Sequence, residues 1–300
     1  MQDQDREIQT LKLGDEDYPR LLTEISRPPE TLYVKGTLLE EDEAAVAIVG
    51  TRSATPYGID MAGWLGGELA RSGITVVSGL AEGIDAAAHE GALKAGGRTI
   101  AVVGHGLDIV YPKLHWGLAR KIEQSGCILS EFPVGTPPLR QNFPQRNRII
   151  SGMSLGVVVV EAPVKSGALI TAKYAMEQGR EVFAVPGPAF SKQSHGAHAL
   201  LKDGAKLVCR LEDILEEMVP HLKYVVRNVG SSLPEAGSVP SLTRMESAVF
   251  KAVPVGSGKN LEAIAQATSL RPSELLPVLT GLEIKGLVRQ APGQGFSRSN

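Results

Sequence analysis

Seven short apolar runs that alternate with helix-like segments constrain the fold of this 300-residue chain more than any other feature. The runs are rich in β-branched residues and occupy 44–50, 74–79, 98–104, 127–131, 155–161, 180–187 and 205–209. Continuously apolar runs are typical of parallel strands that are covered on both faces. Helices are predicted between them, over 58–71, 84–95, 114–125 and 168–178. This alternation predicts an α/β fold with a doubly wound, mostly parallel sheet.

The chain divides into four parts by composition. Residues 1–43 are predicted to be an acidic lead-in to a Rossmann-like domain over 44–224. Residues 225–240 are rich in Gly, Ser and Pro, which is typical of a flexible linker. Residues 241–300 are predicted to form a small winged-helix domain, with helices over 244–253, 261–268 and 272–285 and a β-wing after them. A short turn between the second and third helices fits a helix-turn-helix.

The composition excludes several protein classes. The chain is 43% apolar and 21% charged, close to the average for soluble globular proteins. Cys127 and Cys209 lie far apart, which predicts two buried thiols in a reducing compartment. No secretory signal begins the chain, and no apolar run approaches the roughly 20 residues that cross a bilayer. These features predict a cytoplasmic protein without a membrane partner.

The net charge of −2 argues, taken alone, against nucleic acid as a partner. The charge is unevenly distributed, however. Residues 1–45 hold 12 acidic and 5 basic residues, whereas residues 241–300 hold 4 acidic and 7 basic ones. Because most of the acidity belongs to the N-terminal part, local placement of charge decides whether a nucleic acid can bind.

Two predicted strands end in loops suited to anions. The first ends in Gly50-Thr51-Arg52, where glycine lets the backbone approach a ligand and the next helix offers its N-terminus to a phosphate. Arg52 can grip a phosphate bidentately, although a tight turn with a surface arginine would look the same. The second loop contains Ser78, Gly79, Glu82, Gly83 and Asp85. Its two acids are either ordinary helix-start residues or a carboxylate pair.

The segment 139–148 carries the most informative chemistry. Arg140, Arg146 and Arg148 stand among Phe143, Pro144 and Asn147, with no acid inside the segment. Arginines bind phosphates, and an exposed phenylalanine offers a platform on which a base can stack. The combination favours single-stranded nucleic acid, although a charge run alone is often only a solvated surface.

A second anion-binding loop follows the fifth strand. Ser166-Gly167 opens a predicted helix between Lys165 and Lys173, with Thr171 in the first turns. The loop lacks the Gly-Lys-Ser/Thr order of a nucleotide P-loop. The histidines show no metal spacing, no Gly-x-Ser-x-Gly motif occurs, and neither cysteine has an activating context. We therefore predict no enzyme activity, with no catalytic residue, no metal and no cofactor.

Taken in order, these motifs resemble the DNA-processing protein A family (DprA/Smf), bacterial proteins of natural transformation. The matching stretches are Pro28-Pro29, Leu32-Tyr33-Val34-Lys35-Gly36, Ile48-Val49-Gly50-Thr51-Arg52, Ser78-Gly79-Leu80-Ala81, Gly83-Ile84-Asp85, Ala88-His89, Gly106-Leu107-Asp108, Tyr111-Pro112, Ser130-Glu131, Phe143-Pro144, Arg146-Asn147-Arg148-Ile149-Ile150, Ser166-Gly167-Ala168-Leu169-Ile170-Thr171-Ala172 and Val185-Pro186-Gly187. Each is weak alone, but their order over residues 28–210 is specific. One departure is His198, which stands where the family usually has Asn.

The resemblance implies an extended Rossmann domain that binds single-stranded DNA, protects incoming DNA, dimerises and helps to load a RecA-type recombinase during transformation. It does not imply catalysis. By position it implies that Arg52, Phe143, Arg146, Asn147, Arg148 and the Ser166–Thr171 loop form the DNA-binding surface. Charge and placement add further residues, so that the full predicted set is Gly50, Thr51, Arg52, Ser78, Gly79, Gly83, Arg140, Phe143, Arg146, Asn147, Arg148, Lys165, Ser166, Gly167, Thr171 and Lys173.

Alternatives stay open from the sequence. A Rossmann-like enzyme that acts on a nucleotide or a phosphorylated sugar would also need anion-binding loops. An interaction scaffold would make the basic segment incidental. The C-terminal domain, with its excess of basic residues, fits either duplex DNA or a protein partner.

Overall fold

The computed structural model describes residues 7–218, 244–254, 260–268, 270–271, 275, 278–279, 282, 288–291 and 295–298. The chain forms two compact units, 1–231 and 232–300. Each unit is described by itself. The predicted linker, 225–240, lies outside the described residues.

The first unit is built on one nine-stranded sheet, in the order β1-β2-β6-β5-β4-β3-β7-β8-β9. The strands are β1 (Ile8–Lys12), β2 (Thr31–Gly36), β3 (Ala45–Val49), β4 (Thr75–Ser78), β5 (Thr99–Val102), β6 (Cys127–Ser130), β7 (Gly156–Val159), β8 (Glu181–Ala184) and β9 (Lys206–Leu207). All pairings from β6 through β9 are parallel. The seven predicted strands are therefore confirmed as β3 to β9, in a mostly parallel sheet.

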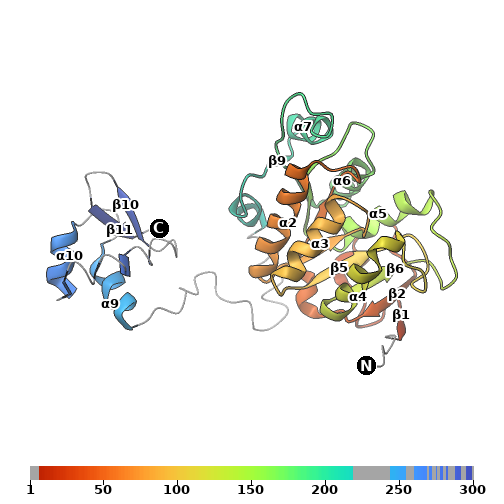
Figure 1. The fold of residues 1–300 in the computed structure, drawn as a ribbon. Coiled ribbons are helices and arrows are strands. Elements are labelled where there is room, and N and C mark those ends of the chain that lie inside the picture. Colours follow the sequence, from red (N-terminus) through yellow and green to blue (C-terminus); the bar gives the residue numbers. More distant parts are fainter. Residues whose placement is uncertain are drawn as a thin grey trace. The chain divides into compact units, whose positions relative to one another are not determined.

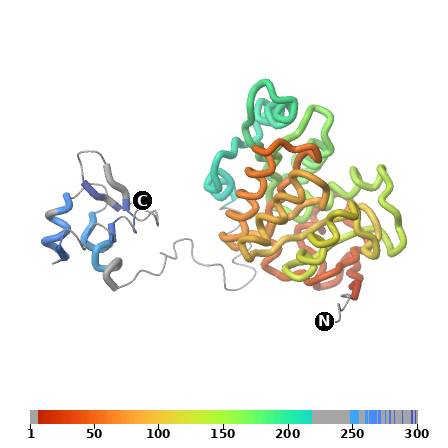
Figure 2. Tube along the Cα trace, viewed as in Figure 1, coloured from red at the N-terminus to blue at the C-terminus, as the bar shows by residue number. Residues whose placement is uncertain are grey.

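The N-terminal segment differs from the prediction. Residues 1–43 were expected to lie ahead of the domain, yet β1 and β2 extend its sheet, with β2 antiparallel to β6. Figures 1 and 2 show this red segment beside β6 at the edge of the sheet. Leu32 and Val34 alternate with half-buried residues along β2 and pack into the core. The alternation of buried and half-buried positions along β2 explains why no continuous apolar run marked this strand.

Helices cover both faces of the sheet. Helices α2, α3 and α4 lie together in front of it in Figure 1, and α2 and α3 pack against one buried apolar cluster. Helices α5, α6 and α7 pack against a second cluster with α1. Their bounds are α1 (Arg20–Thr23), α2 (Pro56–Arg71), α3 (Ile84–Lys94), α4 (Trp116–Ser125), α5 (Asn142–Gly152), α6 (Gly167–Glu177) and α7 (His195–Lys202). The four predicted helices are confirmed as α2, α3, α4 and α6, whereas α1, α5 and α7 were not predicted.

The order of the strands reverses beside β3. From β3 the chain proceeds through β4, β5 and β6 on one side, and through β7, β8 and β9 on the other. The carboxyl ends of β3 and β7 are therefore neighbours, and the segments that follow them lead to opposite sides of the sheet. In open α/β sheets this switch point is where ligands bind.

The two cysteines have different environments. Cys127 is buried in β6, and burial raises its pKa well above the ordinary value, with a further rise from the charge of Asp42. Cys209 is exposed, so the expectation of two buried thiols is wrong for this residue. The edge strand β9 before it contains only Lys206 and Leu207, and both are exposed. Among the described residues, no helix is both long and apolar enough to cross a membrane.

The second unit contains two described helices and a hairpin. These are α9 (Arg244–Ala252), α10 (Leu261–Thr268), and β10 (Val288–Ala291) paired antiparallel with β11 (Gly295–Arg298). Two predicted helices and the β-wing are confirmed, while the third predicted helix, 272–285, lies mostly outside the described residues. Val249, Ile264 and Phe296 share one apolar core. Arg298 links the hairpin to α9 by donating from Nε to the Phe250 carbonyl at 3.0 Å.

Candidate nucleic-acid interface

A pocket of about 300 Å³ lies at the switch point. The loops after β3 and β7 form it together with the first turns of α5 and α6. It brings together ten of the predicted binding residues, namely Gly50, Thr51, Arg52, Phe143, Arg146, Asn147, Lys165, Ser166, Gly167 and Thr171. A smaller adjoining pocket includes Gly79 and Tyr111. The remaining predicted residues, Ser78, Gly83, Arg140, Arg148 and Lys173, line neither pocket.

The loop after β3 is fixed by the loop after β7. The Thr51 N–H donates to the Glu161 carbonyl at 2.7 Å, and the buried Glu161 carboxylate accepts from the Thr55 N–H at 2.9 Å and from the Thr55 hydroxyl at 2.7 Å. Glu161 thus fastens the start of α2. Gly83 lets the next loop pack closely, because its φ is +80° and a β carbon there would lie 2.5 Å from the Thr51 carbonyl oxygen. Arg52 projects into solvent from this fixed loop.

Arg52 lies over an aromatic pair. Its guanidinium carbon is 5.3 Å from the ring centroid of Phe143, which is within cation–π range. The ring of Tyr111 is 6.0 Å from that of Phe143, at an interplanar angle of 34°. Phe143 is half-buried, whereas Tyr111 is 42% exposed and has the more accessible ring. Sequence reasoning missed Tyr111 as a site residue, although it stands in one of the family motifs.

Arg146 forms the floor of the pocket and is buried, at 4% exposure. One of its terminal nitrogens donates to the Gly79 carbonyl at 2.7 Å and also to the Val102 carbonyl, so the side chain joins the ends of β4 and β5. Burial lowers the pKa of Arg146 to about 10, and the nearby Asp85 carboxylate partly offsets this effect. Arg146 therefore keeps its positive charge at neutral pH.

Asp85 is buried beside Arg146, under the loop that follows β4. Its carboxylate accepts from the Gly79 N–H at 3.2 Å and from the Ala81 N–H at 3.4 Å. Burial raises its pKa, and the charge of Arg146 opposes that rise. Gly79 leaves room for this pair, because a β carbon there would lie 2.6 Å from Asp85 Oδ2 and 2.8 Å from the Arg146 nitrogens. Glu82, the other acid of this loop, is exposed, whereas Asp85 is buried.

The N-terminus of α6 forms the opposite wall. Ser166 is its N-cap, and the Ser166 hydroxyl accepts from the Ala168 N–H at 3.2 Å. Asn147 Nδ2 donates to the Gly167 carbonyl at 3.1 Å and so joins α5 to this turn. Thr171 is buried, and Lys165 is exposed at the pocket. The positive end of the helix dipole and the lysine together favour an anion here.

The three arginines of 139–148 do not form one patch. Arg148 lies two residues beyond Arg146 on α5, and side chains with that spacing do not face each other. It pairs with Glu131 at 2.6 Å, and the two side chains are only 12% and 10% exposed. Arg140 is exposed just before α5. Their contact with a nucleic acid stays a prediction.

Three more predicted residues have structural partners. Lys173 lies 3.7 Å from Glu177 on the exposed face of α6. The buried Ser78 hydroxyl donates to the Ile48 carbonyl at 2.6 Å and joins β4 to β3. Gly83 permits the close packing described above. DNA binding by these residues also stays a prediction.

His198 fastens the loop after β8. Its Nε2 lies 3.0 Å from the Gly187 carbonyl oxygen and 3.4 Å from the Gly187 nitrogen. The histidine therefore contacts the backbone of this loop from α7. In the structure this histidine helps to hold that loop.

The charge around the pocket is positive. Arg52 and Lys165 are exposed at its rim, and Arg146 lies beneath them. Asp85 is the one acidic residue that lines the pocket among those the structure describes, and it is buried. Within the described ranges, no group of three or more His, Cys, Asp or Glu side chains is placed to hold a metal ion.

Two family models match the chain. The model of DNA recombination-mediator protein A matches residues 9–219, and that of the DprA winged helix domain matches residues 234–294. The second match confirms the winged-helix prediction for the C-terminal unit.

Similar proteins are found among bacteria. The Protein Smf of Escherichia coli strain K12 is 40% identical over 290 residues, which span 94% of this chain and 75% of that protein. The DNA processing protein DprA of Bacillus subtilis strain 168 is 46% identical over 213 residues, with 70% and 71% covered.

Two solved structures resemble the fold. The DNA processing protein A of Streptococcus pneumoniae aligns with a TM-score of 0.68 and 43% identity, over 71% of this chain and 75% of that one. A structure that describes the single-stranded DNA binding mode of DNA processing protein A from Helicobacter pylori aligns with a TM-score of 0.65 and 31% identity, over 72% and 97%.

Proposed function

Because this chain belongs to the family of DNA recombination-mediator protein A, we propose that it binds single-stranded DNA at the switch-point pocket. The observation that carries the proposal is an exposed arginine, Arg52, which lies over Phe143 of the Tyr111–Phe143 aromatic pair at the rim of a positively charged pocket. The solved Helicobacter pylori relative, described with single-stranded DNA, supports the choice of ligand.

Each part of the pocket suits one part of a single strand. The Arg52 guanidinium, the Lys165 ammonium and the N-terminus of α6 offer positive charge and N–H donors to phosphate oxygens. Tyr111 and Phe143 offer aromatic surface on which a base can stack. Bases in a duplex are already stacked on one another, whereas the bases of a single strand are free to stack on a protein ring. The site is therefore expected to prefer single strands.

We propose further that binding serves recombination rather than chemistry on the DNA. In this role the protein protects incoming single strands, acts as a homodimer, and helps a RecA-type recombinase to assemble on them during natural transformation. Membership of the family supports this role. The winged-helix unit is expected to contact either duplex DNA or a protein partner.

Fluorescence anisotropy with the full chain tests the binding step. Labelled single-stranded and double-stranded oligonucleotides of equal length are titrated at two salt concentrations, with an unlabelled mononucleotide as competitor. We expect tighter binding of the single strand and a logarithmic salt slope of about 0.7 per phosphate contact. Equal affinity for both forms, no salt slope, or full competition by the mononucleotide would overturn the proposal. The last outcome would favour an enzyme that acts on a nucleotide.

A further inference from the structure

We propose that the bound strand continues beyond the pocket onto the loop 186–194, where Phe190 stacks a base and Lys192 contacts a phosphate. This inference rests on the proposed function, and it extends the binding surface across the carboxyl end of β8. None of the predicted binding residues lies in this loop.

Phe190 is the observation that points to a ligand. Its side chain is 100% exposed. A phenylalanine left wholly in water forgoes the burial that normally drives apolar side chains into a core. Aromatic side chains presented in this way beside positive charge are the stacking platforms of proteins that bind single strands.

The loop is held in place by the start of α2 and by the loops after β3 and β7. The Tyr57 hydroxyl donates to the Pro186 carbonyl, and Gln193 Nε2 donates to the Ser53 carbonyl, both at 2.7 Å. The Ala162 N–H donates to the Gln193 carbonyl at 2.7 Å. Together with the contact between His198 and Gly187, these bonds fasten both ends of the loop. Phe190 is therefore displayed on a fixed support.

The charge of this region suits a polyanion. Lys192 is exposed in the loop, and no Asp or Glu occurs in residues 182–202. Lys165 is exposed on the neighbouring loop after β7. The phosphates of a DNA strand that extends from the pocket toward this loop therefore meet Lys165 and Lys192, and residues 182–202 present no carboxylate to them.

The order of the strands gives the direction of the path. Because β7 lies between β3 and β8, the loop with Lys165 lies between Arg52 and Phe190 along the carboxyl edge. Adjacent strands are about 4.8 Å apart, so the carboxyl ends of β3 and β8 lie about 10 Å apart, and Gln193 connects the loops that follow these two strands. In our proposal a DNA strand held by Arg52 therefore continues along this edge toward Phe190, with Lys165 on the loop after the intervening strand β7.

A length series of oligonucleotides tests this path. The full chain and its Phe190→Ala variant are titrated with labelled oligothymidylates of about 4 and about 16 nucleotides, which span the site sizes of known single-strand binders. We expect the variant to bind the longer strand about fivefold or more weakly and the shorter strand as well as the original chain does. Phe190→Trp should retain binding of the longer strand.

Two control variants separate the possible failures. Met176→Ala removes another exposed apolar side chain, 55% exposed in the last turn of α6, and should leave both affinities unchanged. Arg52→Ala should weaken binding of both lengths. If Arg52→Ala has that effect and Phe190→Ala changes neither affinity, this inference is overturned while the proposed function stands. If neither oligonucleotide binds the original chain, the proposed function itself fails.

Discussion

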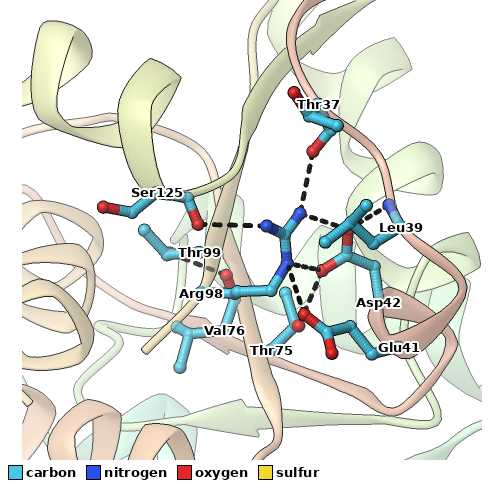
Figure 3. A network of polar contacts seen from close by, with 9 residues as sticks. All are labelled: Thr37, Leu39, Glu41, Asp42, Thr75, Val76, Arg98, Thr99 and Ser125. Atoms are coloured by element: carbon cyan, nitrogen blue, oxygen red, sulfur yellow. Dashed lines mark hydrogen bonds and ion pairs between the residues drawn. The ribbon is translucent and has the colours of Figure 1, made fainter. Parts of the chain in front are cut away.

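The two edges of the parallel sheet use arginine in opposite ways. At the amino edge, Arg98 precedes β5 and is enclosed by partners, as Figure 3 shows. Its Nε and Nη2 donate to the Asp42 carboxylate at 2.8 and 2.7 Å, and Nη2 also donates to the Thr37 carbonyl at 2.8 Å. At the carboxyl edge, Arg52 is exposed over Phe143. Among the described residues, no carboxylate lies within ion-pair distance of Arg52.

The difference shows what each edge contributes. Asp42 is buried and also accepts from the Thr75 hydroxyl at 2.8 Å and from the Leu39 N–H at 2.9 Å, so its lone pairs are used within the protein. Although burial alone lowers the pKa of Arg98, the hydrogen bonds and charge of Asp42 raise it. The amino edge therefore stabilises the fold, and the carboxyl edge keeps its charge available for a ligand.

The largest expected effect is on the stability of the amino edge. Replacing Asp42 by alanine leaves the half-buried Arg98 guanidinium without its main partner. We expect the free energy of unfolding, measured in urea, to fall by about 3–5 kcal/mol. The affinity of the folded variant for single-stranded DNA should not change.

Glu41 provides a matched control for that variant. Its carboxylate lies 3.5 Å from Arg98 but is 59% exposed, so Glu41→Ala should cost less than about 1 kcal/mol. Equal losses in the two variants would show that the buried network does not carry the stability of this edge. A loss of DNA affinity in folded Asp42→Ala would remove the contrast between the edges.

The next effect concerns the aromatic pair at the carboxyl edge. Tyr111→Ala removes the more exposed ring and should weaken single-strand binding by about 1–3 kcal/mol if a base stacks there. Tyr111→Phe keeps the ring and should bind like the original chain. Anisotropy titrations of both variants measure this effect. Weakened binding by Tyr111→Phe would show that the hydroxyl, and not the ring, makes the contact.

A smaller effect is expected on the free energy of unfolding when the pH is lowered, because of His89 on α3. Its Nδ1 lies 2.7 Å from the Thr99 hydroxyl, which donates to the Val76 carbonyl at 2.8 Å near the amino edge. Burial, with the charges of His115 and Arg146, lowers the pKa of His89 from 6.5 to about 3. Below pH 6.5 the unfolded chain binds a proton here that the folded chain does not. This contribution to stability is therefore complete above pH 6.5 and is lost as the pH falls toward 3.

His89→Gln tests this dependence because it keeps an N–H donor that does not titrate. Between pH 7.5 and 5.5, the original chain should lose about 1.4 kcal/mol of unfolding free energy more than the variant does. Urea unfolding at the two pH values measures the difference, and carboxylates common to both chains cancel. Equal losses would mean that His89 does not titrate differently in the folded and unfolded states.

Much of the fold could be predicted because buried parallel strands are continuously apolar. The antiparallel strands β1 and β2 were missed because β1 has no buried residue and β2 buries only every second side chain, so neither is a continuous apolar run. Helix α5 was missed because its sequence is polar and contains Pro144. That proline lies in the first turn, where its missing N–H breaks no helical bond.

The location of the site could be predicted from the sequence, but the contacts and burial of each side chain could not. The family resemblance implies that Arg52 and Ser166 share one binding surface, and the observed strand order, with β3 beside β7, brings their loops together at the switch point. The environments of Arg146 and Arg148 depend on Asp85 and Glu131, which come from distant parts of the chain. Tyr111 likewise reaches Phe143 from the region after β5. Such pairings are set by tertiary packing and cannot be read from local sequence.

The salt dependence of single-strand binding tests the carboxyl edge most directly. The original chain is compared with the double variant Arg52→Ala/Lys165→Ala, which removes two exposed charges from the rim of the pocket. We expect the logarithmic salt slope to become shallower by about 1.4, since each phosphate contact contributes about 0.7. The unfolding free energy should stay within about 0.5 kcal/mol per substitution. An unchanged slope in a folded double variant would show that single-stranded DNA does not bind through this edge of the sheet.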